Sequence, residues 1–431
     1  MKKSIYLFFL FLFCFQFLGI GRVFSQFTFS GEYRPRTEYR HGFKTLAYPD
    51  QDPAFFISQR ARLKFDYDNK KFKVFFSLQD VRTWGSTSQL NISDGFFSVH
   101  EAWGEYLFTK DFGLRVGRQE LVYDNSRIFG NVGWAQQARS HDLALLKYTK
   151  KTFKIHLGLA YNQDKEQLNT NIYTIPKNYK TIQYLWLRKD FEKVGGSLLF
   201  LNNGVQHVDT SSGEGSVRYS QTLGTYLNFK FGLLRLNVSG YYQMGKDPAN
   251  RDLSAGYLMG EVLLPFKSGF TPILGVELIS GTDQYVTPPS DNGNNSFAPL
   301  YGTNHKFNGF MDYFYVGNHG NSVGLNDIYL VGKYKKGKFS PMIAFHYFAS
   351  AAKVLDPANS NNTLNNYLGL EMDIVVGWAL AKEVNLNVGY SQMFASETME
   401  TLKGGDHKAM NNWAWLMLTF KPQFFKTKKG K

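Results

Sequence analysis

Residues 31–40 read GEYRPRTEYR, and the alternation in this stretch decides the fold. In a β-strand, successive side chains point to opposite faces. One face then carries small, aromatic and apolar side chains, namely Gly31, Tyr33, Pro35, Thr37 and Tyr39. The other face is entirely charged and carries Glu32, Arg34, Arg36, Glu38 and Arg40. The class of protein depends on which of the two faces lies inside.

The first 25 residues have the form of a secretory signal peptide. Two lysines precede an apolar run over residues 5–20, and Val23 and Ser25 stand where a cleavage site requires small or aliphatic residues. We predict cleavage after Ser25; the alternative, an uncleaved membrane anchor, requires a longer apolar run. Cys14, the single cysteine, lies in this run. Residues 26–431 therefore hold no disulfide, thiol nucleophile or cysteine-zinc site.

The composition favours an outer-membrane barrel over a soluble enzyme. Aromatic residues make up 17% of the chain, and the formal net charge is +14 at pH 7. After residue 25 no apolar run reaches the roughly 18 residues that a membrane helix needs. An exported, aromatic-rich chain of this kind fits the outer membrane of a Gram-negative cell. Its basic balance favours anionic glycans or lipids as partners and argues against nucleic acid.

Alternating segments recur to the end of the chain, and their period of two excludes helix as the main element. Clear examples are FFISQRARLKFDYD (55–68), KFKVFFSLQD (71–80), FKIHLGLAYN (153–162), LLRLNVSGYYQ (233–243) and YLGLEMDIVV (367–376). The connections alternate in length. Tight turns lie at 68–70, 110–111, 150–151, 192–193, 230–232, 267–269, 335–338 and 381–383, with long polar loops between them.

Short turns at one end and long loops at the other are typical of a transmembrane barrel. We predict an all-β fold, a transmembrane antiparallel up-and-down β-barrel of about 18 strands formed by residues 26–431, with both termini in the periplasm. Segments 143–149 and 253–265 are ambiguous, so sixteen strands stay possible. The apolar face of residues 31–40 then meets lipid, and the charged face meets a water-filled lumen. The loop at 282–324 exceeds what strand pairing needs, and we expect part of it, LYGTNHKF (300–307), to fold into the mouth.

Several long stretches resemble the alginate-export family of outer-membrane porins, in its Bacteroidetes-type branch. They are GEYRPRTEYRHGF (31–43), FISQRARLKFDYDNKKFKVFFSLQDVRTWG (56–85), EAWGEYLF (101–108), GLRVGRQELVYDNSRIFGNVGWAQQARSHD (113–142) and FAPLYGTNHKFNGFMDYF (297–314). The resemblance implies an eighteen-stranded monomeric barrel that passes an acidic polysaccharide or a similar anion through an arginine-lined constriction. By motif, it places basic lumen residues at Arg34, Arg36, Arg62, Arg82 and Arg118. The family's later basic lumen residues cannot be matched one by one here, because the strands after residue 215 carry mostly acids.

The strand pattern itself separates the charges of the lumen into two groups. Basic inward positions gather early in the chain, at Arg34, Arg36, Arg40, Arg60, Arg62, Lys64 and Arg115. Acidic inward positions gather late, at Glu277, Asp327, Glu371 and Asp373. Guanidinium groups pair with carboxylates in a bidentate way and stay charged, so the basic group predicts anion selectivity. The alternative is that these charges are merely solvated and paired with one another.

No constellation predicts catalysis, a metal or a cofactor. Glu101 and Glu105 are two inward carboxylates about 13 Å apart on a strand, beyond the spacing of glycosidase pairs. His141, His305 and His319 lack the spacing of metal-binding motifs. His156 has no evident partner for a barrel-embedded hydrolase.

The sequence thus supports a diffusion channel for an anionic oligo- or polysaccharide of the alginate-export type. A general or small-anion porin is the alternative, and a barrel-embedded hydrolase is the third hypothesis. The sequence names neither the substrate nor the direction of transport. It leaves open whether periplasmic export or uptake components are partners beside the outer-membrane lipids.

Overall fold

The computed structural model describes residues 25–209, 211–284 and 293–427, so the expected signal peptide lies outside the described residues apart from Ser25. Strands dominate the chain. They are β1 (Gln26–His41), β2 (Ala54–Asp68), β3 (Phe72–Thr83), β4 (Phe97–Leu107), β5 (Phe112–Gln119), β6 (His141–Lys150), β7 (Phe153–Tyr161), β8 (Thr181–Asp190), β9 (Val194–Val208), β10 (Gly215–Phe231), β11 (Leu234–Lys246), β12 (Asp252–Leu263), β13 (Phe270–Ile279), β14 (Leu325–Tyr334), β15 (Phe339–Ala349), β16 (Tyr367–Ala381), β17 (Val384–Ala395), β18 (Asn411–Phe420) and β19 (Gln423–Lys426). The helical elements of this part of the chain are η1 (Val316–Asn318) and α2 (Glu397–Lys403), and neither is long enough to cross a membrane.

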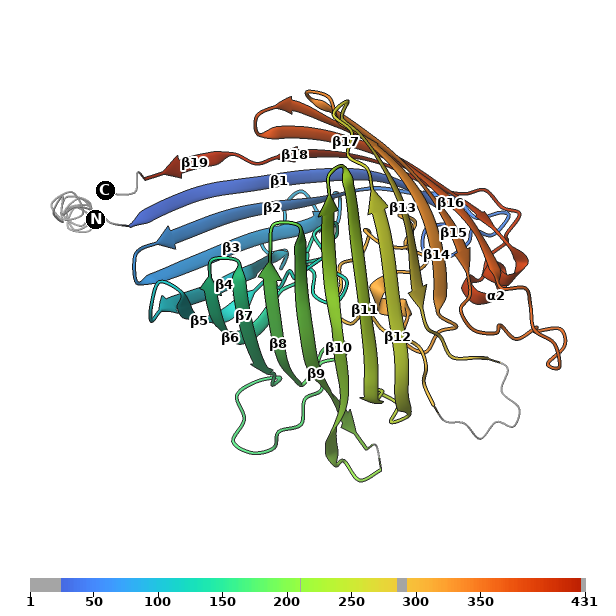
Figure 1. Cartoon of the computed structure of the whole chain (residues 1–431), viewed down its shortest axis with the longest axis horizontal. Coiled ribbons are helices and arrows are strands. Elements are labelled where there is room, and N and C mark those ends of the chain that lie inside the picture. The colour runs from blue at the N-terminus through green and yellow to red at the C-terminus, as the bar shows by residue number, and fades with distance from the viewer. Residues whose placement is uncertain (1–24, 210, 285–292, 428–431) are drawn as a thin grey trace.

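The strands close into one antiparallel barrel (Figure 1). Each strand up to β18 pairs with the next along the chain, and β1 closes the sheet on β18. β19 continues β18 after a break at residues 421–422, because it pairs with the first part of β1, with Thr28 opposite Lys426. β18 and β19 are therefore one barrel strand, and the predicted eighteen strands are confirmed. Both ambiguous segments form strands of the barrel, β6 and β12, so the alternative of a sixteen-stranded barrel is excluded.

The two ends of the barrel differ as the turn lengths predicted. The hairpin between β2 and β3 spans only residues 69–71, whereas the connection between β5 and β6 spans residues 120–140. The start of β1 and the end of β19 lie side by side at the short-turn end (Figure 1). In an outer-membrane barrel this end faces the periplasm, and the long loops face outside.

The faces of β1 and β2 also follow the prediction. Tyr33 and Leu63 lie on the outer face and are 38% and 43% exposed, as expected for side chains that meet lipid. Arg34 and Arg60 are directly opposite each other in the register and lie on the buried inner face. Alternation alone therefore placed the charged side of residues 31–40 inside.

The interior differs from the open, water-filled lumen that we expected. Two long connections fold into it: the β5–β6 loop (residues 120–140) and the described part of the β13–β14 loop (residues 280–284 and 293–324). Phe129 and Tyr301 form a parallel bridge between them, and the Gly130 N–H donates to the Tyr301 carbonyl at 2.9 Å. The expectation that LYGTNHKF folds inward is thus confirmed.

These two loops bring a hydrophobic core into the barrel. Buried loop side chains pack against inward side chains of the strands, among them Phe129, Phe297, Met311 and Tyr313 with Leu145, Leu199, Tyr257 and Trp413. A barrel of this diameter cannot fill its interior with strand side chains alone. The expectation of an unfilled barrel was wrong because the loops supply the missing apolar volume.

Candidate functional site

Four arginines form a patch on the inner face of two neighbouring strands. Arg34 and Arg36 come from β1, and Arg60 and Arg62 come from β2. We call these four residues the arginine arc. Each is between 4% and 7% exposed, so the patch is covered.

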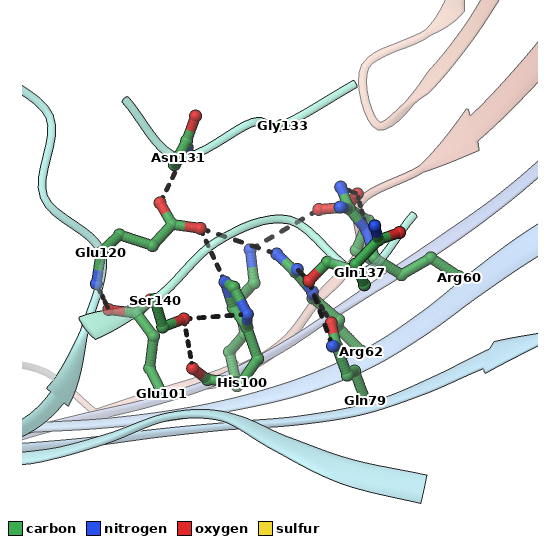
Figure 2. A network of polar contacts seen from close by, with 12 residues as sticks. Arg60, Arg62, Gln79, His100, Glu101, Glu120, Asn131, Gly133, Gln137 and Ser140 are labelled. Carbon is green, nitrogen blue, oxygen red and sulfur yellow. Dashed lines mark hydrogen bonds and ion pairs between the residues drawn. The ribbon is translucent and has the colours of Figure 1, made fainter. Parts of the chain in front are cut away.

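The cover is the β5–β6 loop, whose backbone carbonyls accept hydrogen bonds from the arc. Arg34 donates to Gly133 at 2.8 Å and to Trp134 at 3.0 Å, Arg36 to Trp134 at 2.7 Å, Arg60 to Gln136 at 3.1 Å and Arg62 to Gln137 at 3.3 Å. Figure 2 shows Arg60 and Arg62 beside this segment of the loop. Charged donors make stronger hydrogen bonds than neutral ones, so the arc both holds the loop and keeps its own charge.

Carboxylates compensate only part of the charge around the arc. Glu38 pairs with Arg36 at 2.8 Å and with Arg40 at 2.7 Å, while Glu32 pairs with Arg60 at 2.5 Å and with Lys64 at 3.6 Å. Arg62 has only a distant partner, Glu120 at 3.9 Å. Arg34 makes no ion pair within the described residues. The inner face of β1 and β2 therefore keeps a surplus of positive charge.

Glu120 ties the start of the β5–β6 loop to the barrel wall (Figure 2). Its carboxylate lies 2.7 Å from His100 Nε2 and accepts from Asn131 Nδ2 at 2.8 Å. Burial by itself raises the pKa of Glu120, but the hydrogen bonds from His100 and Asn131 and the charge of Arg62 outweigh burial. The pKa of Glu120 therefore lies below its ordinary value.

We expect acid to loosen this loop. A carboxyl whose pKa is lowered by folding contributes stability above its ordinary pKa of 4.5, and that stability is lost as the pH falls further. Single-channel recordings should show more frequent current fluctuations as the pH falls below about 4.5. A Glu120→Gln variant should show them already at neutral pH and respond less to acid. Identical pH profiles for the two proteins would contradict a role for Glu120.

Four carboxylates form a second buried patch on another part of the barrel wall. Glu277 lies on β13, Asp327 on β14, and Glu371 and Asp373 on β16, and none is more than 2% exposed. We call these four residues the acidic arc. Pairing places Glu277 directly opposite Asp327.

The acidic arc holds the β13–β14 loop. Asn308 donates to Glu277 at 2.8 Å and to Asp327 at 3.1 Å, and the Met311 N–H donates to Glu371 at 2.8 Å. Arg127 of the other loop lies 3.3 Å from Glu277 and donates to Asn308 at 3.0 Å. The two inserted loops are thus fixed to opposite charges on the wall and joined to each other.

This architecture agrees with what sequence comparison finds. A family described as alginate export matches residues 25–412 of the chain. The chain belongs to the alginate export family. A search of curated proteins gave no match.

Solved structures similar to this alginate export protein are outer-membrane barrels. A BenF-like porin from Pseudomonas fluorescens Pf-5 has a TM-score of 0.60 at 11% identity, covering 92% of this chain and 99% of the porin. Pseudomonas aeruginosa OccK2 (OpdF), in complex with glucuronate, has a TM-score of 0.60 at 11% identity over 93% of this chain and 98% of its own. Pseudomonas aeruginosa OpdK, with vanillate, has a TM-score of 0.57 at 11% identity, covering 93% of this chain and 99% of OpdK. At this identity the likeness concerns the fold. With the family match, it identifies a channel-type barrel of the Gram-negative outer membrane.

Two residues that the family motif suggested for the lumen of this alginate export protein lie elsewhere. Arg82 pairs across the sheet with Gln59 on the outer face and forms ion pairs with Asp80 and Asp94. Arg118 is 47% exposed and lies 3.3 Å from Asp142. Each stands three residues from an inward side chain, Gln79 or Arg115, and an odd spacing puts a residue on the opposite face. The motif located the strands correctly but not these two side chains.

The other predicted basic residues do lie on the inner face. Arg40 and Lys64 are about one-third exposed and share the carboxylates of the arginine arc. Arg115 pairs with Glu105 at 2.6 Å and lies over the Trp103 ring, 3.7 Å from its centroid. Lys147 donates to the same carboxylate at 2.9 Å, so Glu105 is fully occupied.

The sequence analysis overlooked further basic residues. Arg127 and Arg139 lie in the β5–β6 loop, and no pattern in the sequence shows that this loop folds inward. Lys154, Arg188, Lys230 and Arg235 lie on the inner faces of β7, β8, β10 and β11. Alternation puts Lys154 and Arg235 on the same face as inward His156 and Asn237, but the sequence analysis did not count them among the lumen charges.

One group near the arginine arc has ligand-type atoms close enough for a metal. Atoms of His100, Glu101 and Glu120 lie within 4.8 Å of one another. They already bond to the protein, since Glu101 accepts from the Glu120 N–H at 3.0 Å. The nearby guanidinium of Arg62 disfavours a cation. The group therefore acts as a hydrogen-bond network that anchors the loop (Figure 2).

Cavities lie on both sides of the inserted loops. One of about 370 Å³ lies toward the long loops and is lined in part by Arg218, Gln243 and Tyr301. Two more, of about 480 and 470 Å³, lie toward the short turns and share Asp124, Tyr226 and Asn237 as lining residues.

Proposed function

We propose that this alginate export protein is an outer-membrane diffusion channel for anionic saccharides that carry carboxylates, as oligo- or polysaccharides. The channel class follows from the family and from the barrel. The chemistry of the substrate is our inference from the charges inside the barrel.

The surplus positive charge at the arginine arc carries this proposal. Arg34 has no carboxylate partner among the described residues, and Arg62 has only a distant one. In a partly desolvated interior an uncompensated charge acts over longer distances than it does in water. An anion that passes the β5–β6 loop therefore meets an attractive potential, even though the loop backbone covers the guanidinium groups.

The chemistry suits carboxylates and permits release. Guanidinium groups stay protonated at any physiological pH, so the attraction is permanent. Because the loop prevents direct bidentate pairing, the attraction stays moderate, and transport requires that the substrate can leave. Glucuronate and vanillate, found with two structurally similar barrels, are both carboxylates. This agrees with the proposed class of substrate.

A second candidate is a channel for small organic anions. The observation that favours it is the occupied interior, where Phe129 and Tyr301 bring the two loops into contact. A polymer needs a continuous path wider than a sugar ring, whereas a small anion needs less space. Both candidates require anion preference.

The test is a reversal-potential measurement across a planar bilayer under a salt gradient. We expect the wild-type channel to prefer anions, and a cation-preferring channel would reject the proposal. An oligouronate that blocks the current more strongly than its monomer supports the saccharide channel. Equal block by monomer and oligomer supports the small-anion channel.

A further inference from the structure

The cavity of about 480 Å³ is bounded by the short-turn ends of four strands, β7, β8, β10 and β11, and by residues 122–124 of the β5–β6 loop. We call it the periplasmic pocket. It lies on a different part of the wall from the arginine arc on β1 and β2. Its volume is within the range of about 300–1,000 Å³ that is usual for small-molecule sites.

Three cations line this pocket without a carboxylate partner. Lys154, Lys230 and Arg235 make no ion pair within the described part of the chain. The register places Lys230 directly opposite Arg235, and Lys154 directly opposite Arg188, so their side chains project from one continuous inner surface. Lys230 and Arg235, directly opposite on neighbouring strands, repel each other, and an anion beside them relieves that repulsion.

The acid that lines the pocket is already occupied. Asp124 accepts from Arg188 at 3.3 Å through Oδ1 and from Trp186 Nε1 at 3.1 Å through Oδ2. Arg188 is in turn held by Asp190 at 2.5 Å and by Asn228 at 3.0 Å. Asp124 therefore cannot neutralise the three free cations, and the pocket is left electropositive.

The rest of the lining fits a sugar better than a simple ion. The amides of Asn228 and Asn237 can exchange hydrogen bonds with hydroxyl groups. Tyr226 and Trp186 add aromatic surface, which is complementary to the apolar C–H face of a pyranose ring. A few convergent polar groups beside aromatic rings are typical of a ligand site.

We propose that the periplasmic pocket binds one carboxylate-bearing sugar unit, as the station that a saccharide occupies on the periplasmic side of the inserted loops. This inference rests on the proposed function for the class of substrate and adds a second anion site to it. The carboxylate lies among Lys154, Lys230 and Arg235, and the ring lies toward Tyr226.

The experiment measures binding of glucuronate to the purified full barrel in detergent by saturation-transfer NMR titration. Glucose serves as the neutral sugar and acetate as the carboxylate without a ring. The wild-type protein should bind glucuronate at least about tenfold more tightly than either, because each comparison ligand lacks one set of contacts. Equal affinity for glucuronate and acetate would reduce the pocket to a charged patch and overturn the proposal.

The variant is Lys154→Gln/Lys230→Gln/Arg235→Gln, which should weaken glucuronate binding by about tenfold or more. A matched control, Lys110→Gln/Lys267→Gln/Lys382→Gln, removes the same charge from other periplasmic turns and should bind like wild type. An unchanged affinity in the first variant, or an equal loss in the control, would overturn the proposal.

The same proteins separate this proposal from the proposed function. If the wild-type channel prefers anions, and the pocket variant binds glucuronate as well as the wild type does, the pocket proposal is overturned and the proposed function stands. If the wild-type channel prefers cations, and the pocket variant nevertheless loses glucuronate binding, the pocket proposal is supported and the proposed function is rejected.

Discussion

Replacing residues 298–310 with a short Gly-Ser linker should raise the single-channel conductance several-fold. This segment crosses the barrel interior and contacts three parts of it. Tyr301 donates to Asn203 of β9 at 2.5 Å, and His305 stacks on Trp134 with 4.0 Å between ring centroids. Asn308 donates to Glu277 of the acidic arc at 2.8 Å. Because the ionic current through a wide barrel depends on its narrowest section, removal of this crossing segment should widen the path.

The matched control is a deletion within the β3–β4 connection, over residues 87–93. Leu90 and Ile92 in that connection are 96% and 104% exposed, so it lies outside the barrel interior. We expect its removal to leave the conductance unchanged. A migration difference between boiled and unboiled samples on a detergent gel shows that both variants still form closed barrels. An unchanged conductance in the first variant would mean that the β13–β14 loop does not limit the current.

The two inserted loops also show where prediction from the sequence ends. The register of β1 and β2 could be predicted because each strand alternates clearly and a shift by one residue would expose every arginine to lipid. In contrast, Arg34 is bonded to Gly133 and Gln136, about one hundred residues away in the chain. Every residue has a backbone carbonyl, so no pattern of side chains in the sequence shows which carbonyls accept hydrogen bonds from an arginine. Length alone suggested that the β13–β14 loop folds inward.

Strand β8 of the barrel wall shows the same limit of prediction from the sequence. Its sequence, TIQYLWLRKD, is apolar on both faces, because Tyr184 and Trp186 point inward against the loop side chain Tyr123. Alternation identifies an inward face only where that face meets water. Where a loop covers the wall, the inward face becomes apolar and the signal disappears. For this reason the sequence predicted the arginine arc but missed Arg188 and the pocket around it.

The selectivity of the channel should depend on the uncompensated charge of Arg34. An Arg34→Met variant removes one positive charge that no carboxylate offsets. For an anion about 8 Å away and an effective dielectric constant of about 40, one charge contributes about 1 kcal/mol. Losing this charge weakens the attraction of an anion and the repulsion of a cation by that amount each, so the preference for anions over cations should fall about thirtyfold, seen as a shift of the reversal potential under a salt gradient.

A second variant tests whether charge or loop position is responsible. Arg36→Met/Glu38→Gln also removes a donor to the Trp134 carbonyl, but it deletes one positive and one negative charge together. The β5–β6 loop loses this hydrogen bond and the contact of the Arg36 guanidinium with the Trp134 ring, 4.1 Å from its centroid, while the net charge of the wall stays the same. We expect this double variant to keep the wild-type anion preference.

Salt concentration and a charge-preserving variant complete the argument. The screening length falls from about 10 Å at 0.1 M salt to about 3 Å at 1 M, so the difference between wild type and Arg34→Met should shrink at high salt. Arg34→Lys keeps the charge but loses the forked contacts to Gly133 and Gln136, and it should keep most of the anion preference. The charge explanation is wrong if Arg34→Lys and the double variant lose as much anion preference as Arg34→Met. A displaced backbone of the β5–β6 loop would then be the one change that all three variants share, and the position of this loop would set the selectivity.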